Sequence, residues 1–360
     1  MQIRANAAAR RLCILSAAMA AGAAVVAFAA WPQAALAAPK TDVIVLVNGD
    51  HITGEIKSLE YNRLKVSTDH MGTVYIEWDK IARVQTDQHL LLERGDGSRY
   101  YGQLAAPDQD AQLAVRRSAD GKAEPVDMST VVRAQPIEGG GFIDRLDGYV
   151  SAGFDLSQSG DNTTFNFAGG LSSRSRVREW SLDGTADLTD DSARRTERYD
   201  VSGVQRRLLQ GQNFYQGQLS FTRNTELDLN LRSQFGGGLG RYFVRSNSME
   251  WRAGAGLAYT HENYQSEGAF DSIELVLATD FSVFRYDFPE TDIGGSVALF
   301  PSLTKSGRYR AEGDVHAKYE FVDDLYFELR MYGSYDSDPP VEGDVASGDY
   351  GVVTSLGYKF

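Results

Sequence analysis

The sequence predicts an all-β chain in which a small β module with an internal repeat precedes an antiparallel transmembrane β-barrel of about 12 strands. Three observations predict this fold. Apolar and polar residues alternate with a period of two in many segments, turn residues separate these segments, and few segments show the helical period. The last ten residues, "GVVTSLGYKF", keep the alternation up to a terminal aromatic residue.

Residues 1–37 have the pattern of a secretory signal peptide. Arginines precede an apolar run, and Ala35, Leu36 and Ala37 form a small-residue cleavage site. An uncleaved membrane anchor is the alternative, but the Ala-rich run is of marginal length for spanning a bilayer. Cys13, the only cysteine, lies inside this leader. We therefore expect a mature chain without disulfides, a thiol nucleophile or a cysteine-based metal site.

The chain has a formal net charge of −13, and the leader contains arginines but no acidic residue. The mature chain is therefore more acidic still. Such a protein does not attract nucleic acid through its overall charge, so we expect no nucleic-acid partner. No later apolar stretch is long enough for a transmembrane helix, and we expect no cofactor.

Residues 41–136 contain a degenerate repeat, with copies at 41–87 and 88–136. The first copy contains "DVIVLVNGDHITGEI" and the second "HLLLERGDGSRYYGQL", each with an apolar strand, a Gly-Asp turn and a later glycine. We expect Gly49 and Gly95 to supply the positive φ of the turns, and Gly54 and Gly102 to allow a bulge or sharp bend. The pattern resembles small five-stranded SH3-like or Sm-like barrels. RNA binding does not follow, because the region has no basic aromatic groove.

Residues 137–145 form a Gly-rich linker, and regular alternation fills residues 146–360. In "RYRAEGDVHAKYEF", Tyr309, Val315 and Phe321 share one face, while charged residues occupy the other. In a soluble sandwich the apolar face would meet a core, whereas in a membrane barrel it would meet lipid. Many of the strands are long, and short turns alternate with longer polar loops, which is typical of an outer-membrane barrel with periplasmic turns.

The end of the chain fits a closed barrel, since closure requires the final strand to pair with the first. The terminal aromatic residues, Tyr358 and Phe360, resemble the signal read by the outer-membrane barrel assembly machinery. The expected partners are therefore this machinery and outer-membrane lipid.

The polar faces of the predicted strands supply the candidate functional residues. Mixed charges on these faces can line a water-filled pore, or they can pair across the interior and close it. The candidates for lining the lumen are Asp155, Asp183, Asp187, Arg232, Arg252, Glu274, Asp280, Arg310, Glu312, Asp314, His316, Lys318, Glu328 and Arg330.

Catalysis is not expected. His261 and His316 are the only histidines of the predicted barrel, and neither lies in a protease-like or lipase-like motif. We expect His261 to lie at the outer rim and His316 to belong to a lattice of ion pairs. Acidic loops such as "DSDPPVEGD" could bind divalent cations, but a solvated acidic loop is the better explanation. We expect no metal site.

The region from about Asp147 to Phe360 resembles the bacterial family called domain of unknown function 481. The similarity rests on "DGYVSAGFDLSQSGDNTTFNFAGGLSSRS" near its start and "VVTSLGYKF" at its end. Members are often labelled salt-induced outer membrane proteins, and the leading module resembles one that often precedes this domain. The resemblance implies an outer-membrane barrel and supplies neither a catalytic residue nor a substrate.

Together these features predict an outer-membrane protein whose N-terminal module lies in the periplasm. The first functional hypothesis is a narrow channel for ions or small polar solutes. The alternative is a non-conducting structural or envelope-stress barrel whose module binds a periplasmic protein or a cell-wall partner.

Overall fold

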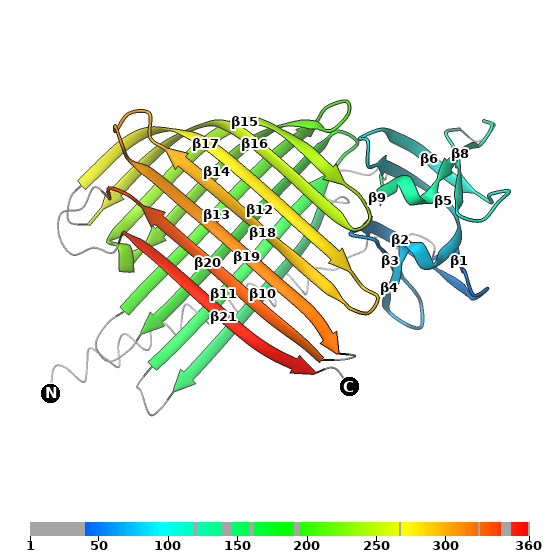
Figure 1. The fold of residues 1–360 in the computed structure, drawn as a ribbon, viewed down its shortest axis with the longest axis horizontal. Helices are drawn as coiled ribbons and strands as arrows, with labels where there is room; N and C mark the ends of the chain where they lie inside the picture. Colours follow the sequence, from blue (N-terminus) through cyan, green and yellow to red (C-terminus); the bar gives the residue numbers. More distant parts are fainter. Residues whose placement is uncertain are drawn as a thin grey trace.

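The computed structural model describes residues 40–118, 121–137, 146–157, 162–190, 195–265, 268–322, 325–339 and 347–358. Within these ranges the regular structure consists of strands and short 3-10 turns, as Figure 1 shows. The predicted leader, most of the predicted linker and Phe360 lie outside the described residues. In the part of the chain that is described, no helix has the length and apolar character needed to span a membrane.

The N-terminal module is a nine-stranded antiparallel sheet that curls on itself. Its strands run in the order β4-β3-β2-β1-β5-β6-β7-β8, and β9 pairs with both β2 and β5. The elements are β1 (Asp42–Leu46), β2 (His51–Glu60), β3 (Arg63–Ser67), β4 (Thr73–Glu77), η1 (Trp78–Lys80), β5 (Ile81–Arg94), β6 (Arg99–Ala105), β7 (Gln112–Arg116), β8 (Glu124–Asp127), η2 (Met128–Thr130) and β9 (Val131–Pro136).

The two predicted copies of the repeat are joined into one unit. A single strand, β5, runs through the expected boundary at residues 87 and 88, and each copy has a 3-10 turn at the same place, η1 or η2. Trp78 of η1 is buried and donates its indole N–H to the carbonyl oxygen of Met128 in η2, at 2.8 Å. A shared core, which includes Ile56, Leu92 and Leu113, fills the space between the strands. The likeness of each copy to SH3-like barrels stays a prediction.

The glycines of the repeat have roles that differ in part from those predicted. Gly49 has the expected positive φ of 90°, but in the second copy the positive φ of 82° belongs to Gly97, so the prediction for Gly95 is wrong. A side chain at Gly95 would instead overlap the carbonyl oxygen of Arg245, outside the module. At Gly54 a Cβ would lie 2.5 Å from Val66, and at Gly102 it would overlap a carbonyl of the next strand. These two glycines therefore permit close approach of a neighbouring strand.

The twelve strands predicted after the module are confirmed as one antiparallel sheet, in which each strand pairs with the next along the chain. They are β10 (Leu146–Ser157), β11 (Asn162–Arg174), β12 (Arg178–Asp190), β13 (Arg195–Leu208), β14 (Asn213–Asn224), β15 (Leu229–Arg245), β16 (Met249–Tyr264), β17 (Gly268–Arg285), β18 (Thr291–Pro301), β19 (Tyr309–Val322), β20 (Leu325–Asp336) and β21 (Gly348–Tyr358), with a 3-10 turn η4 (Thr225–Leu227) before β15.

The large sheet is strongly curled but not closed, so the predicted pairing of the final strand with the first is wrong for this structure. β10 pairs only with β11, and β21 pairs only with β20, among the strands that are described. Val352 and Val353 of β21 point to opposite faces and are both more than half exposed. The described ion pairs that cross the interior join β15, β16, β17, β19 and β20, and none reaches either edge strand. No ion pair of the described residues therefore links the two edges.

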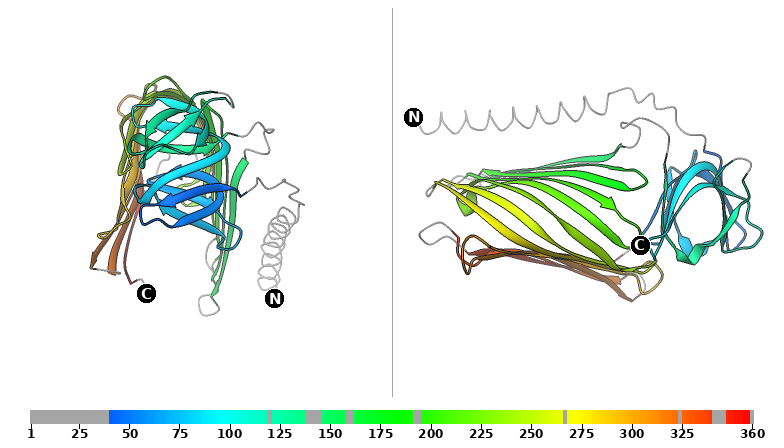
Figure 2. Two further views of the ribbon diagram at one scale, coloured as in Figure 1. Left: turned by 90° about the vertical axis from the view of Figure 1, so that its right-hand side faces the viewer. Right: turned by 90° about the horizontal axis from the view of Figure 1, so that it is seen from above.

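The module lies against one end of the large sheet, as both views in Figure 2 show. The contacting ends are the short turns β11–β12, β13–β14, β15–β16 and β17–β18. We call this the module end. The opposite end carries the connections β14–β15, β16–β17, β18–β19 and β20–β21 and is called the far end.

Candidate functional site

The two faces of the large sheet differ sharply in chemistry. On one face, large apolar side chains are exposed on strand after strand, including Leu239, Leu257, Ile273 and Val297. On the other face lie buried charged side chains such as Glu262 of β16. Glu262 binds Arg308, which directly precedes β19, so their side chains meet across β17 and β18. Such a contact requires the sheet to curl toward this face, and the charged face is therefore the concave one.

At the far end, six charged residues form a balanced cluster on the concave face. We call it the far-end cluster, and it comprises Arg232, Glu262, Glu274, Arg308, Arg310 and Asp336. The shortest N···O distances are 2.7 Å for Arg232–Glu262, 2.8 Å for Glu262–Arg308, 2.6 Å for Arg308–Asp336 and 2.7 Å for Arg310–Glu274.

Most side chains of the far-end cluster are buried, and they pack against one another inside the curled sheet. Glu262 and Glu274 are each 1% exposed, and Arg308 and Arg310 are each 3% exposed. The hydroxyl of Thr260 donates to Glu274 at 2.7 Å, and two nitrogens of Arg310 donate to the same carboxylate. Buried charges persist only when they are paired in this way. The cluster therefore occupies space that an open passage would need.

Some of the predicted lumen residues are brought together and others are not. Arg232, Glu274 and Arg310 join the far-end cluster, and three further ion pairs are Arg252–Asp280, Arg310–Glu312 and Arg330–Asp314. The Nε2 of His316 lies 3.5 Å from a carboxylate oxygen of Asp292. Lys318 binds Glu290 at 3.0 Å. Among the described residues, Asp183, Asp187 and Glu328 make no ion pair, and the side chain of Asp155 lies outside the description. That these residues line a lumen stays a prediction.

A second charged cluster holds the module against the sheet, and its centre is Glu93 of β5. Glu93 is fully buried and binds Arg99 of the module at 2.8 Å. It also binds Arg174 of β11 at 2.6 Å and Arg245 of β15 at 2.8 Å, both from the large sheet. Burial opposes ionisation of Glu93, but the neighbouring guanidinium groups outweigh it and hold the pKa of this carboxyl well below its ordinary value. Glu93 therefore links module and sheet as a carboxylate.

The same cluster continues through Glu179 at the start of β12. Glu179 accepts contacts from Arg174 at 2.8 Å and from Arg133 and Arg206 at 3.3 Å each. Arg133 belongs to β9 of the module and also binds Glu60. Burial lowers the pKa of Arg133, but these acidic partners outweigh it and raise the pKa well above its ordinary value. We call this whole set, from Glu93 to Glu179, the docking cluster.

Next to the docking cluster, a cavity of about 860 Å³ lies between the module and the concave face. Its walls come from β2, β3, β4 and β9 of the module and from β10 to β14, β16 and β17 of the sheet. Most lining side chains are polar, and Val204 and Trp180 are the apolar exceptions. We call it the junction chamber. It occupies the module end of the interior.

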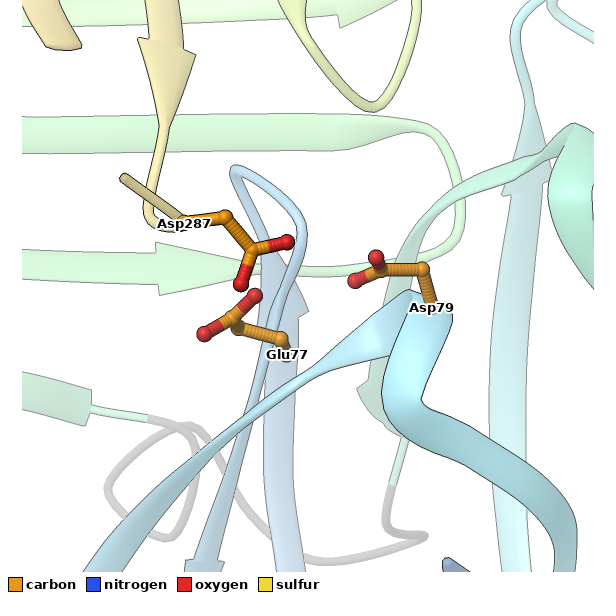
Figure 3. Close-up of side chains that lie close together, drawn as sticks. All are labelled: Glu77, Asp79 and Asp287. Atoms are coloured by element: carbon orange, nitrogen blue, oxygen red, sulfur yellow. The ribbon is translucent and has the colours of Figure 1, made fainter. Parts of the chain in front are cut away.

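Three acidic side chains at the junction come close enough to hold a cation. Ligand atoms of Glu77, Asp79 and Asp287 lie within 4.8 Å of one another, and Figure 3 shows their carboxylates turned toward one another. Lys80 already supplies one positive charge to this group, with its Nζ 2.8 Å from Asp287 and 3.7 Å from Asp79. The arrangement acts as an ion-pair contact between module and sheet.

His261 lies on the convex, exposed face near the far end. Its Nδ1 is 2.7 Å from a carboxylate oxygen of Asp271, which also accepts the hydroxyl of Tyr259 at 2.5 Å. Ser233 is the register partner of His261 on β15, but its hydroxyl makes no hydrogen bond to the imidazole. These described contacts assemble no activated nucleophile. Tyr358, the described half of the predicted assembly signal, is 62% exposed opposite Leu325.

Sequence reasoning missed the residues that organise both clusters. Glu262 and Arg308 have the same strand parity as predicted lumen residues, and this signal could have identified them. Glu93, Arg174 and Arg245 carried no such signal, because their contact depends on how the module meets the sheet.

The fold and site define an all-β protein with a curled twelve-stranded antiparallel sheet, an apolar convex face and a charged concave face closed at one end by a β module. The family model described as "Protein of unknown function, DUF481" matches residues 150–360. The chain belongs to this family. A search of the curated proteins and a search of the solved structures each gave no match.

Proposed function

We propose that this chain is an outer-membrane β-barrel protein whose charged interior is a narrow passage for ions or small polar solutes, closed in the conformation described. The observation that carries the proposal is the division of the sheet into an apolar convex face and a charged concave face. That division suits a barrel with lipid outside and water or ion pairs inside. The N-terminal module would then lie in the periplasm.

The proposal requires β10 and β21 to pair in the membrane. Lipid offers no hydrogen-bond partner for a free strand edge, and each unsatisfied backbone group there costs several kcal/mol. In water the same groups are solvated, so an open seam is tolerated. Insertion into the bilayer thus supplies a reason for closure that is absent from the isolated chain.

Two features support a closed resting state. The far-end cluster fills the interior near one mouth with six paired charges. The module covers the other mouth and is held by the docking cluster. Passage would require at least one of these groups of ion pairs to rearrange. Mixed-sign linings of this kind can also set ion selectivity.

Ion flux through vesicles tests the proposal. The mature protein is refolded into lipid vesicles loaded with a potassium-sensitive dye, and influx is compared with that of Glu274→Gln. The substitution removes one carboxylate that neutralises Arg310, so we expect faster influx through the variant. A matched control is Asp338→Asn, which alters an exposed far-end ion pair with Lys305. Equal influx in folded wild type, variant and protein-free vesicles would refute the passage.

A second function is favoured by a different observation. Large apolar side chains of the module, Val47, Met71 and Tyr75, are 65%, 62% and 58% exposed. In a non-conducting barrel these could contact a periplasmic protein or cell-wall partner. This second function would be supported if the wild-type protein gave no ion flux in the preceding assay and if substitution of Met71 and Tyr75 with Ser abolished capture of the partner. Neither proposed function includes a catalytic step.

A further inference from the structure

We propose that the junction chamber is a binding site for a small oxyanion, a ligand whose phosphate or carboxylate oxygens accept several hydrogen bonds. The chamber is distinct from the far-end cluster, and binding there does not require the interior to conduct.

The first observation is the charge of the walls. The basic lining residues outnumber the acidic ones, although the chain as a whole is acidic. The basic residues are Lys57, Lys65, Arg133, Arg174, Arg206 and Arg252, against Glu60, Asp147, Glu179 and Asp280. Lys57 is paired with Glu55 and Arg252 with Asp280, so the excess lies with Lys65 and the three arginines around Glu179. A confined region of positive charge in an acidic protein attracts small anions selectively.

The second observation is how these charges are distributed. Arg133, Arg174 and Arg206 all converge on one carboxylate, Glu179. Each guanidinium has five N–H donors, and one carboxylate cannot satisfy three of them. Glu60 and Glu93 take up further donors of Arg133 and Arg174, and Gln216 takes up two of Arg206, yet an excess of donors over acceptors remains.

Unpartnered polar atoms in the walls give a third, independent indication. Arg174 is 9% exposed, and its buried Nε has no hydrogen-bond partner. Lys65, on the module wall, makes no hydrogen bond or ion pair within the described part of the chain. Buried polar groups are rarely left unpaired, so the Nε of Arg174 indicates a place for an acceptor, and the half-buried Lys65 adds a positive charge on the opposite wall. The buried Oε1 of Gln135 also lacks a partner, and rotation of its amide would present a further donor.

The size and lining limit the class of ligand. At about 860 Å³ the chamber is large enough for a small solute with its water, and its polar walls do not favour an apolar ligand. Serine hydroxyls at Ser58, Ser172 and Ser181 also line the chamber and can donate to oxygen. The planar guanidinium group can donate two parallel N–H···O hydrogen bonds to two oxygens of a phosphate or a carboxylate. The oxyanion could be a free solute or the phosphate of a lipid headgroup.

Titration calorimetry on the full mature protein in detergent tests the site, with inorganic phosphate as the first probe. We expect saturable binding that weakens at least about ten-fold in Lys65→Gln and recovers in Lys65→Arg, because the positive charge returns. The matched control is Lys305→Gln, which removes an exposed lysine at the far end. A second arm uses a water-soluble short-chain phosphatidic acid, which separates a headgroup from a free phosphate.

The outcomes are distinct. Tighter binding of inorganic phosphate supports a free oxyanion, and tighter binding of the phosphatidic acid supports a lipid headgroup. No saturable binding of either probe, or equal loss of affinity in Lys65→Gln and Lys305→Gln, would overturn the proposal. Since calorimetry needs no transport, a chamber that binds phosphate in a protein without ion flux would refute only the passage.

Discussion

Glu93 provides the sharpest test of how the module is held against the sheet. Its carboxylate is fully buried and binds Arg99, Arg174 and Arg245 at 2.6–2.8 Å. Removing one partner of a buried ion pair costs about 3–5 kcal/mol, because the other charge stays buried without neutralisation. Glutamine keeps the shape and one acceptor, so we take about 3 kcal/mol for Glu93→Gln. At about 1.4 kcal/mol per decade, docking should weaken about 100-fold.

Hydrogen–deuterium exchange measures this loss directly. In Glu93→Gln we expect faster exchange at the turns that meet, around Gly97 of the module and Gly211 of the sheet, while core amides of β2 stay protected. The control is Glu124→Gln, an exposed partner of Arg117, where little change is expected. Gly95→Ala should give the same pattern without altering charge, since its methyl group would overlap the carbonyl of Arg245. Unchanged exchange at both turns in Glu93→Gln would refute the reasoning.

Three further predictions concern stability, insertion and the seam. Burial raises the pKa of Asp42 above its ordinary value of 3.8, although three hydrogen bonds to the carboxylate oppose this. Between the pKa of the unfolded chain and that of the folded module, only the folded module keeps the proton, so the stability of the module falls as the pH rises through this range. Thermal denaturation should therefore show a higher melting temperature for Asp42→Asn than for the wild type at about pH 7 but not at about pH 3. An equal shift at both pH values would contradict this. Leu257→Arg, on the convex face, should make the free energy of folding into vesicles about 2–4 kcal/mol less favourable, whereas Leu303→Arg in the far-end loop should not. Equal yields of folded protein for the two variants on a heat-modifiability gel would count against a lipid-facing surface. If β10 and β21 pair in the bilayer, a cysteine at Ser151 should form a disulfide with a cysteine introduced at one of the positions of β21 that face the concave side. Absence of a disulfide at every such position would show that the two edges stay apart.

The two-residue alternation of apolar and polar residues was enough to predict the class of fold. In β19 apolar and polar residues alternate from Tyr309 up to the β-bulge between Glu320 and Val322, and the face of each side chain follows from its parity. The number of strands after the linker followed from the same signal. The predicted closure is wrong for this structure, because pairing between β10 and β21 depends on the accumulated curl of the whole sheet, which strand parity does not fix.

The candidate site was predictable only as a face, and its pairs were not. Parity put Arg310 and Glu274 on polar faces, but β18 lies between their strands, and only tight curl brings them to 2.7 Å. The docking cluster was beyond prediction, since Glu93 and Arg245 are 152 residues apart and meet through the packing of two units. Gly95 shows the same limit: its turn motif was visible, but the carbonyl that it must avoid belongs to the large sheet.

Single-channel recording in a planar bilayer tests the central claim most directly, namely that the concave face is a passage closed at both mouths. Wild type, Glu93→Gln and Glu274→Gln are compared at the same protein density, after a heat-modifiable shift shows that each is folded. We predict rare, discrete, ion-selective steps for the wild type and a higher open probability for both variants. Folded proteins that stay silent in all three forms would contradict the claim and would leave a non-conducting barrel whose module binds a partner.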